Sequence, residues 1–155
     1  MISPESLRRF PCFGFMNEEQ LKTLAMISDE VILADEETVL EAGQNADYLY
    51  ILVEGNVSNY CVATDSNYQG YYKEFFVTEI NPSEIFGISA LIDPYLYTAT
   101  IRASKPSRAI RISASPLRAM CAADTLLGYN LMREMTRVAI DRLTDAHVML
   151  AAAYA

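Results

Sequence analysis

The sequence predicts a mainly β fold with flanking α-helices, in which a jelly-roll barrel follows N-terminal helices and precedes a long C-terminal helix. Between residues 31 and 112, short runs of β-branched and aromatic residues alternate with turn residues, which is typical of a β-sandwich or barrel. From residue 115 onward, apolar residues recur at steps of three and four, the period of a helix. A chain of 155 residues has the size of one domain. We therefore expect one domain over 1–155, with helices in 1–30, the jelly roll in 31–113 and two more helices in 115–152.

The first quarter of the chain is expected to be helical. Pro11, Cys12 and Phe13 end an initial segment, and Asn17 then precedes Gln20 at the spacing of a capping box. The apolar face of the helix that follows comprises Leu21, Leu24, Ala25 and Ile27.

Seven runs are predicted to be strands, and an eighth strand would complete a jelly roll. They cover residues 31–33, 39–40, 48–53, 57–62, 71–80, 98–103 and 108–112. Turn residues separate the runs, including the segment 67–70 and two glycines, Gly43 and Gly55, at which a positive φ is expected.

Two helices are predicted to follow the strands. Ser115 and Pro116 are typical of a helix start and give a short helix over 116–121, and Asp124 is a second N-cap. The helix from Asp124 to Ala152, about 42 Å long, exceeds what a small barrel covers. Its apolar stripe is therefore predicted to form a homodimer seam, with packing wholly on its own barrel and binding of another protein as alternatives. The stripe comprises Met132, Met135, Ala139, Leu143, Ala146 and Leu150.

Charge and composition exclude several classes of function. The net charge is −8 and no dense Lys/Arg cluster is present, which argues against direct nucleic-acid binding. No apolar run is long enough to cross a bilayer, and the N-terminus lacks the apolar core of a signal peptide, so we expect a cytoplasmic protein without membrane contact.

Catalytic chemistry is not expected either. His147 is the single histidine, so neither a His-rich metal site nor a histidine-based catalytic triad can be assembled within one barrel. Cys12, Cys61 and Cys121 form no CxxC pair and are expected to be reduced, with redox sensing by a free thiol left open.

Residues 83–103, SEIFGISALIDPYLYTATIRA, resemble the phosphate-binding cassette of cyclic-nucleotide-binding domains. The matching positions are Phe86, Gly87, Ala90, Leu91, Ala99 and Thr100. Residues 41–57 are similar to a second segment of the same family. The resemblance implies an eight-stranded jelly roll with B and C helices, as in the sensor half of regulators of the catabolite activator and fumarate-nitrate regulator type. Since the sequence stops at residue 155, we expect a sensor domain without the DNA-binding domain of those regulators, or with that domain on another polypeptide.

Two departures from the cassette concern the residues that grip the ligand. Ile88 stands where the family has a glutamate for the ribose hydroxyl, and Tyr97 stands where it has an arginine for the cyclic phosphate. Hydrogen bonds to charged groups contribute about 1.5–3 kcal/mol each, so losing both weakens binding by about 10²–10⁴-fold. Arg102, the nearest base, is expected to face away from the pocket, because side chains alternate along a strand.

Three interpretations of the pocket therefore stay open. It could bind a cyclic nucleotide through a non-standard site, or a less charged small molecule lying against Ile88, Tyr95, Leu96 and Tyr97, or Ile88 and Tyr97 could fill it and leave a ligand-free interaction module. We expect a non-enzymatic regulatory sensor that signals by movement of its C-terminal helices to a protein effector, and no cofactor is certain. The candidate ligand-binding residues are Phe86, Gly87, Ile88, Ser89, Ala90, Tyr97, Thr98 and Ala99.

Overall fold

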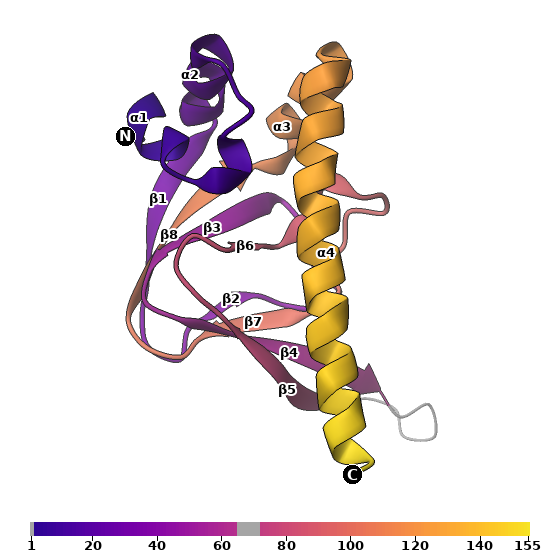
Figure 1. Cartoon of the computed structure of the whole chain (residues 1–155). Coiled ribbons are helices and arrows are strands. Elements are labelled where there is room, and N and C mark those ends of the chain that lie inside the picture. The colour runs from indigo at the N-terminus through magenta and orange to yellow at the C-terminus, as the bar shows by residue number, and fades with distance from the viewer. Residues whose placement is uncertain (1, 65–71) are drawn as a thin grey trace.

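The fold is a two-sheet β-sandwich with helices at one end and along one side (Figure 1). The computed structural model describes residues 2–64 and 72–155. The elements are α1 (Pro4–Arg8), the 3₁₀ turn η1 (Pro11–Phe13), α2 (Glu18–Met26), β1 (Ser28–Leu33), β2 (Thr38–Leu40), β3 (Tyr48–Glu54), β4 (Val57–Thr64), β5 (Tyr72–Ile80), β6 (Ile85–Phe86), the 3₁₀ turn η2 (Ile88–Leu91), β7 (Thr100–Ala103), β8 (Ser107–Ser113), α3 (Ala114–Ala123) and α4 (Thr125–Ala153). The predicted fold class is confirmed.

The strands form two four-stranded antiparallel sheets, ordered β1-β8-β3-β6 and β2-β7-β4-β5. Within the described residues no strand ladder joins the two sheets, so they form a sandwich rather than a closed barrel. The eighth strand is β6, whose two residues pair with Tyr50 and Ile51 of β3. Two residues are too few to show a period of two in the sequence.

Several strand boundaries differ from the predicted ones. β1 begins at Ser28 rather than at residue 31, because Ser28 already pairs with Ile112 of β8. β7 begins at Thr100 rather than at residue 98, since the backbone of Tyr97 bonds instead to the turn around Gly43. The predicted turn at 67–70 and the first residue of the run 71–80 lie outside the described residues.

The N-terminal helices form as predicted. The Asn17 amide donates to Gln20 Oε1 at 2.9 Å and the Gln20 amide donates to Asn17 Oδ1 at 2.8 Å, which completes the capping box. Leu21, Leu24 and Ala25 are buried, and Ile27 ends the helix half-buried.

The start of the C-terminal helices corrects one prediction. The N-cap of α3 is Ser113, not Ser115, and the helix continues to Ala123 rather than ending at residue 121. The earlier start arises because the Ala114 amide donates to the Asp47 carbonyl at 2.9 Å, which fastens the first helical residue to the sandwich. Asp124 caps α4 as predicted, accepting from the Leu127 amide at 3.2 Å.

The first half of α4 is held by apolar packing. Leu127, Leu131 and Met135 are buried in a core shared with the N-terminal helices and with the face of the β1-β8-β3-β6 sheet. A second core lies within the sandwich, around Leu52 and Phe86. Beyond Met135 no residue of α4 is fully buried in the described structure, so the two halves of the helix are held differently.

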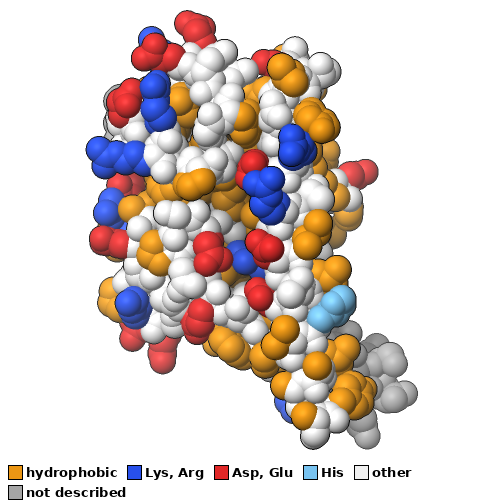
Figure 2. Space-filling view, viewed as in Figure 1, with side chains coloured by type: hydrophobic (Ala, Val, Ile, Leu, Met, Phe, Trp, Pro, Cys, Tyr) orange, Lys and Arg blue, Asp and Glu red, His pale blue; other side chains and the backbone are white. Residues whose placement is uncertain are grey.

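The apolar stripe of α4 is only partly the predicted one. Met135 is buried in the protein's own core, Met132 is half-buried, and Ala139, Leu143, Ala146 and Leu150 are exposed. A different set of exposed apolar side chains repeats at alternating steps of three and four, and such side chains are visible along the lower part of α4 (Figure 2). This stripe, termed the outer stripe, contains Leu126, Tyr129, Ile140, Leu143, Leu150 and Tyr154, with Arg133, Thr136 and His147 at the intervening positions of the same repeat.

Gly55 and Gly43 give a matched test of the turns between strands. Both have positive φ, +96° and +90°, but a Cβ at Gly55 would overlap Ser107 Oγ, whereas among the described residues nothing lies within 4 Å of one at Gly43. Gly43→Ala should lower the free energy of unfolding by about 1–2 kcal/mol through backbone strain alone. Gly55→Ala should lower it by at least about 1 kcal/mol more because of the clash. Urea denaturation measures both, and equal losses would contradict the steric assignment.

Candidate functional site

A cavity of about 260 Å³ lies between the sandwich, the segment 85–99 and α4. Its walls come from β2, β4, β6, β7, the loop before β7 and the second half of α4. The lining residues are Leu40, Asn59, Ile85, Phe86, Gly87, Ile88, Ser89, Tyr97, Thr98, Ala99, Ile101, Val138, Ala139 and Arg142.

Seven of the eight predicted ligand-binding residues line this cavity: Phe86, Gly87, Ile88, Ser89, Tyr97, Thr98 and Ala99. Ala90 does not, because it is fully buried in the core of the sandwich. Tyr95 and Leu96, considered as walls for a less charged ligand, are absent from the lining as well. The Arg118 guanidinium stacks instead on the ring of Tyr95, with its Cζ 3.9 Å from the centroid of that ring.

The cassette turn is short and closely packed. Gly87 precedes η2 in a left-handed conformation, φ +77°, and a Cβ there would lie 3.2 Å from the Tyr48 carbonyl oxygen of β3. The left-handed φ and this approach of two backbones both favour glycine at this position. Since η2 is a single 3₁₀ turn, it offers a ligand only a small helix dipole.

Tyr97 is held by the backbone of β3. Its hydroxyl donates to the Tyr48 carbonyl at 2.7 Å and accepts from the Tyr48 amide at 3.2 Å. The side chain is 7% exposed, and burial raises the pKa of this phenol above its ordinary value. The hydroxyl is therefore occupied, and only the ring of Tyr97 faces the cavity.

The hydroxyls of Ser89 and Thr98 approach each other at 3.5 Å at the rim of the cavity. Both are neutral groups, and neither replaces the charge that the family's arginine would supply. Ile88 is half-buried, lines the cavity and also packs against the first core.

Arg102 is directed away from the cavity, as strand alternation predicts. It makes a bidentate ion pair with Glu74, at 3.0 and 3.1 Å, on the other side of the β2-β7-β4-β5 sheet. Its neighbour Ile101 lines the cavity.

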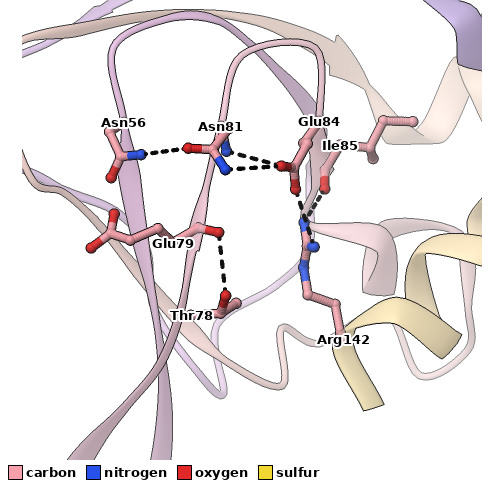
Figure 3. A network of polar contacts seen from close by, with 7 residues as sticks. All are labelled: Asn56, Thr78, Glu79, Asn81, Glu84, Ile85 and Arg142. Carbon is pink, nitrogen blue, oxygen red and sulfur yellow. Dashed lines mark hydrogen bonds and ion pairs between the residues drawn. The ribbon is translucent and has the colours of Figure 1, made fainter. Parts of the chain in front are cut away.

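Arg142 is the charged cavity residue that sequence reasoning missed. It is the one charged residue in the lining, within the part of the chain that is described, and it comes from α4 rather than from the cassette. Its Nη2 donates to the Ile85 carbonyl at 2.8 Å and its Nη1 lies 3.4 Å from Glu84 Oε2 (Figure 3). The helical repeat contains a signal for it, since Arg142 lies on the same face as Leu131, Met135 and Val138.

Glu84 is held in turn by the loop after β5. Glu84 Oε1 accepts from the backbone amide and the side-chain Nδ2 of Asn81, both at 3.3 Å, and Asn81 Oδ1 accepts from Asn56 at 3.0 Å (Figure 3). The Arg142 guanidinium thus ties α4 to β6 and to the preceding loop at the edge of the cavity.

Asn59 of β4 forms part of the wall between the sheets. Its Oδ1 is buried and has no hydrogen-bond partner among the described residues. Buried polar atoms without partners are uncommon in proteins, so this amide is a candidate contact for a ligand or a water.

The cassette is also linked to α3. Arg118 Nη1 donates to the Ala90 carbonyl of η2 at 2.6 Å, and its guanidinium stacks on Tyr95 of the following loop. Each of the two helices that follow the sandwich therefore contacts this segment through an arginine: α3 contacts η2 through Arg118, and α4 contacts β6 through Arg142.

The comparisons with known proteins agree with this architecture. A model of the cyclic nucleotide-binding domain matches residues 30–124, so the chain belongs to the cyclic nucleotide-binding domain family. Among solved structures, a Geobacter metallireducens GS-15 protein assigned by name to cyclic nucleotide binding is 36% identical, with a TM-score of 0.79, covering 92% of this chain and 99% of its own.

Two regulators are also similar. The N-terminal domain of a transcriptional regulator from Streptomyces coelicolor A3(2) is 28% identical over 90% of this chain and 95% of that one, with a TM-score of 0.64. DNR from Pseudomonas aeruginosa, at 23% identity, covers 94% of this chain and 62% of its own with a TM-score of 0.71, which shows a shared fold. No curated protein matches the sequence.

Two further findings concern membrane-spanning helices and metal sites. None of the helices in the described ranges is both long and apolar enough to cross a membrane. Within those same ranges, no group of three or more His, Cys, Asp or Glu side chains is arranged to hold a metal ion.

Removing the Tyr97 hydroxyl tests its structural role. Tyr97→Phe leaves a carbonyl and an amide of Tyr48 without their partner, so the free energy of unfolding should fall by about 1–3 kcal/mol. Tyr129→Phe, at an exposed position on α4, is the control and should change it by less than about 0.5 kcal/mol. A Tyr97→Phe variant as stable as the wild type in urea would contradict the assignment.

Alkaline pH should destabilise the fold. Burial, with a smaller contribution from Glu134, raises the pKa of the Cys12 thiol to about 12, and burial also raises the pKa values of Cys121, Tyr50 and Tyr97. The folded state therefore keeps protons that the unfolded state loses. Stability should decrease once the pH passes about 8.5, where the thiols of the unfolded chain ionise, and further above about 10, where its phenols ionise, by up to about 1.4 kcal/mol per pH unit for each such group.

Urea denaturation across this pH range measures the slope, and Cys12→Ala should make it shallower. Stability that rises with pH above 9, or a slope unchanged in Cys12→Ala, would contradict the assignment to buried thiols and phenols.

Proposed function

We propose that this chain is a non-enzymatic, cytoplasmic regulatory domain in which the state of one small cavity is transmitted through α4 to a second copy of the chain or to a protein effector. The observation that carries the proposal is the composition of the cavity wall. It joins the cassette residues Ile88 and Ser89 to Val138, Ala139 and Arg142 of α4. An occupant would contact the cassette and the long helix at once, so it could favour one position of the helix over another.

Recognition of a cyclic nucleotide in the family's usual way is disfavoured. Ile88 and Tyr97 supply neither of the charged partners, and the Tyr97 hydroxyl is occupied by β3. The cavity, at about 260 Å³, lies below the roughly 300–1,000 Å³ of most ligand sites. A smaller ligand suits this space better.

A ligand-free interaction module is the second candidate function. Two residues favour a ligand-free module, since Tyr97, whose hydroxyl is hydrogen-bonded to β3, and the half-buried Ile88 both contribute to the core as well as to the cavity wall. In this alternative α4 would present its outer stripe to a partner independently of any small molecule.

The outer stripe supports a homodimer. Its nine positions alternate at steps of three and four from Leu126 to Tyr154, and six of the nine are large apolar residues that are at least 55% exposed. This is the repeat of a two-helix coiled coil. A second copy of α4, related by twofold symmetry, would present the same stripe.

Leu143 and Val148 allow the dimer seam to be tested within one helix. Both are apolar and exposed, at 55% and 63%, but Val148 lies off the outer stripe. Leu143→Glu should convert a dimer to a monomer in sedimentation equilibrium, because it would bring two carboxylates together in an apolar seam. Val148→Glu should leave the dimer intact. A wild-type monomer at high concentration, or equal effects of the two changes, would contradict the seam.

Calorimetric titration with cyclic AMP and cyclic GMP tests the account of the cassette. Without the two charged partners, a dissociation constant of about 1 mM or weaker is expected for both. Binding of either nucleotide at micromolar concentration would show that this site recognises cyclic phosphates by other means and would overturn the account.

A further inference from the structure

We infer that Arg142 makes the cavity a site for a small organic monoanion, and that the anion binds by taking the place of Glu84 on the guanidinium. This inference rests on the proposed function, because it assumes that the cavity holds a ligand, and it specifies the chemical class of that ligand.

The charge of the cavity wall defines the class. Arg142 is the single charged residue of the lining in the described chain, and most of the other lining residues are apolar. One guanidinium balances one negative charge, and its planar donors suit a carboxylate or a sulfonate. A ligand with one anionic group and an apolar body matches both parts of the wall.

The ion pair between Arg142 and Glu84 is weak enough to be replaced. Nη1 and Glu84 Oε2 are 3.4 Å apart, and the Glu84 side chain is 39% exposed whereas that of Arg142 is 20% exposed. An ion pair at this distance with one solvated member is weak. A ligand carboxylate in the cavity could therefore compete for Nη1 while the shorter bond to the Ile85 carbonyl is kept.

Glu84 would keep hydrogen-bond partners after the exchange. Its Oε1 keeps the two donors of Asn81, and the side chain has access to water (Figure 3). Asn59, whose buried Oδ1 has no partner among the described residues, would favour a ligand that carries a hydroxyl or N–H donor on its otherwise apolar body.

The exchange also reaches α4. Arg142 ties the second half of this helix to β6 and the preceding loop, and the outer stripe continues along that same half. Replacing Glu84 by a ligand would loosen the link to the loop, so the anion would change how α4 is held.

Benzoate and benzamide are a matched pair of probes, since they have the same shape and differ in charge. We expect benzoate to perturb the amide NMR signals of residues 85–89, 97–99 and 138–142 of the full chain, and to bind at least about tenfold more tightly than benzamide. Arg142→Gln should abolish this preference. Glu84→Gln, which keeps the Asn81 contacts but removes the competing charge, should strengthen benzoate binding about threefold or more.

Arg137→Gln is the control variant, because Arg137 is on the same helix, pairs with Glu134 and does not line the cavity. It should leave benzoate binding unchanged. Equal affinities for benzoate and benzamide, a preference that survives in Arg142→Gln, or no benzoate binding at about 10 mM would each overturn the inference. These outcomes leave the dimer seam intact, whereas a monomeric wild type would count against the proposed function and not against the anion site.

Discussion

The position of α4 across one side of the sandwich is the constraint on which the rest of this structure depends. Its first half is fixed by burial of Leu127, Leu131 and Met135 in a core shared with the N-terminal helices. Its second half is less deeply packed in the described structure, where Val138 is half-buried against the same core and Arg142 provides the link to β6. One rigid helix is thus anchored firmly at one end and by exchangeable polar contacts at the other.

The cavity and part of the outer stripe lie on different sides of the same, less firmly held half of α4. The cavity lies against the loosely held half of α4, where Val138, Ala139 and Arg142 form its wall. The outer stripe continues along the same half, to Leu150 and Tyr154. Contacts of a ligand with the inner side and of a protein with the outer side would therefore act on the same segment, which is the arrangement that coupling between two sites requires.

Local patterns in the sequence predicted the elements whose cause is itself local. The Asn17–Gln20 capping box and the Asp124 cap depend on neighbouring residues and were correct. Ser115 was wrong as a helix start because a distant residue, Asp47, fixes Ala114 as the first helical residue. The strand β6 escaped prediction because pairing with β3, and not its own sequence, makes it a strand.

Only part of the cavity lining could be predicted, again because the sequence shows local features and not distant contacts. Seven of the residues named from the cassette frame line the cavity, because they follow one another in two short segments. Arg142 lies more than forty residues beyond these segments, and only the packing angle of α4 brings it to the cavity. The occupied hydroxyl of Tyr97 depends likewise on the approach of β3, which no spacing in the sequence reveals.

Hydrogen exchange along α4 tests the central claim most directly, because it reports how firmly each half of the helix is held. In the Leu143→Glu background, where a second copy should no longer cover the helix, Arg142→Gln is expected to speed exchange across residues 139–153 and to leave residues 127–135 unchanged. Exchange that is unaltered across residues 139–153, or that is accelerated equally in both halves, would contradict the view that Arg142 is the main polar link between the second half of α4 and the sandwich.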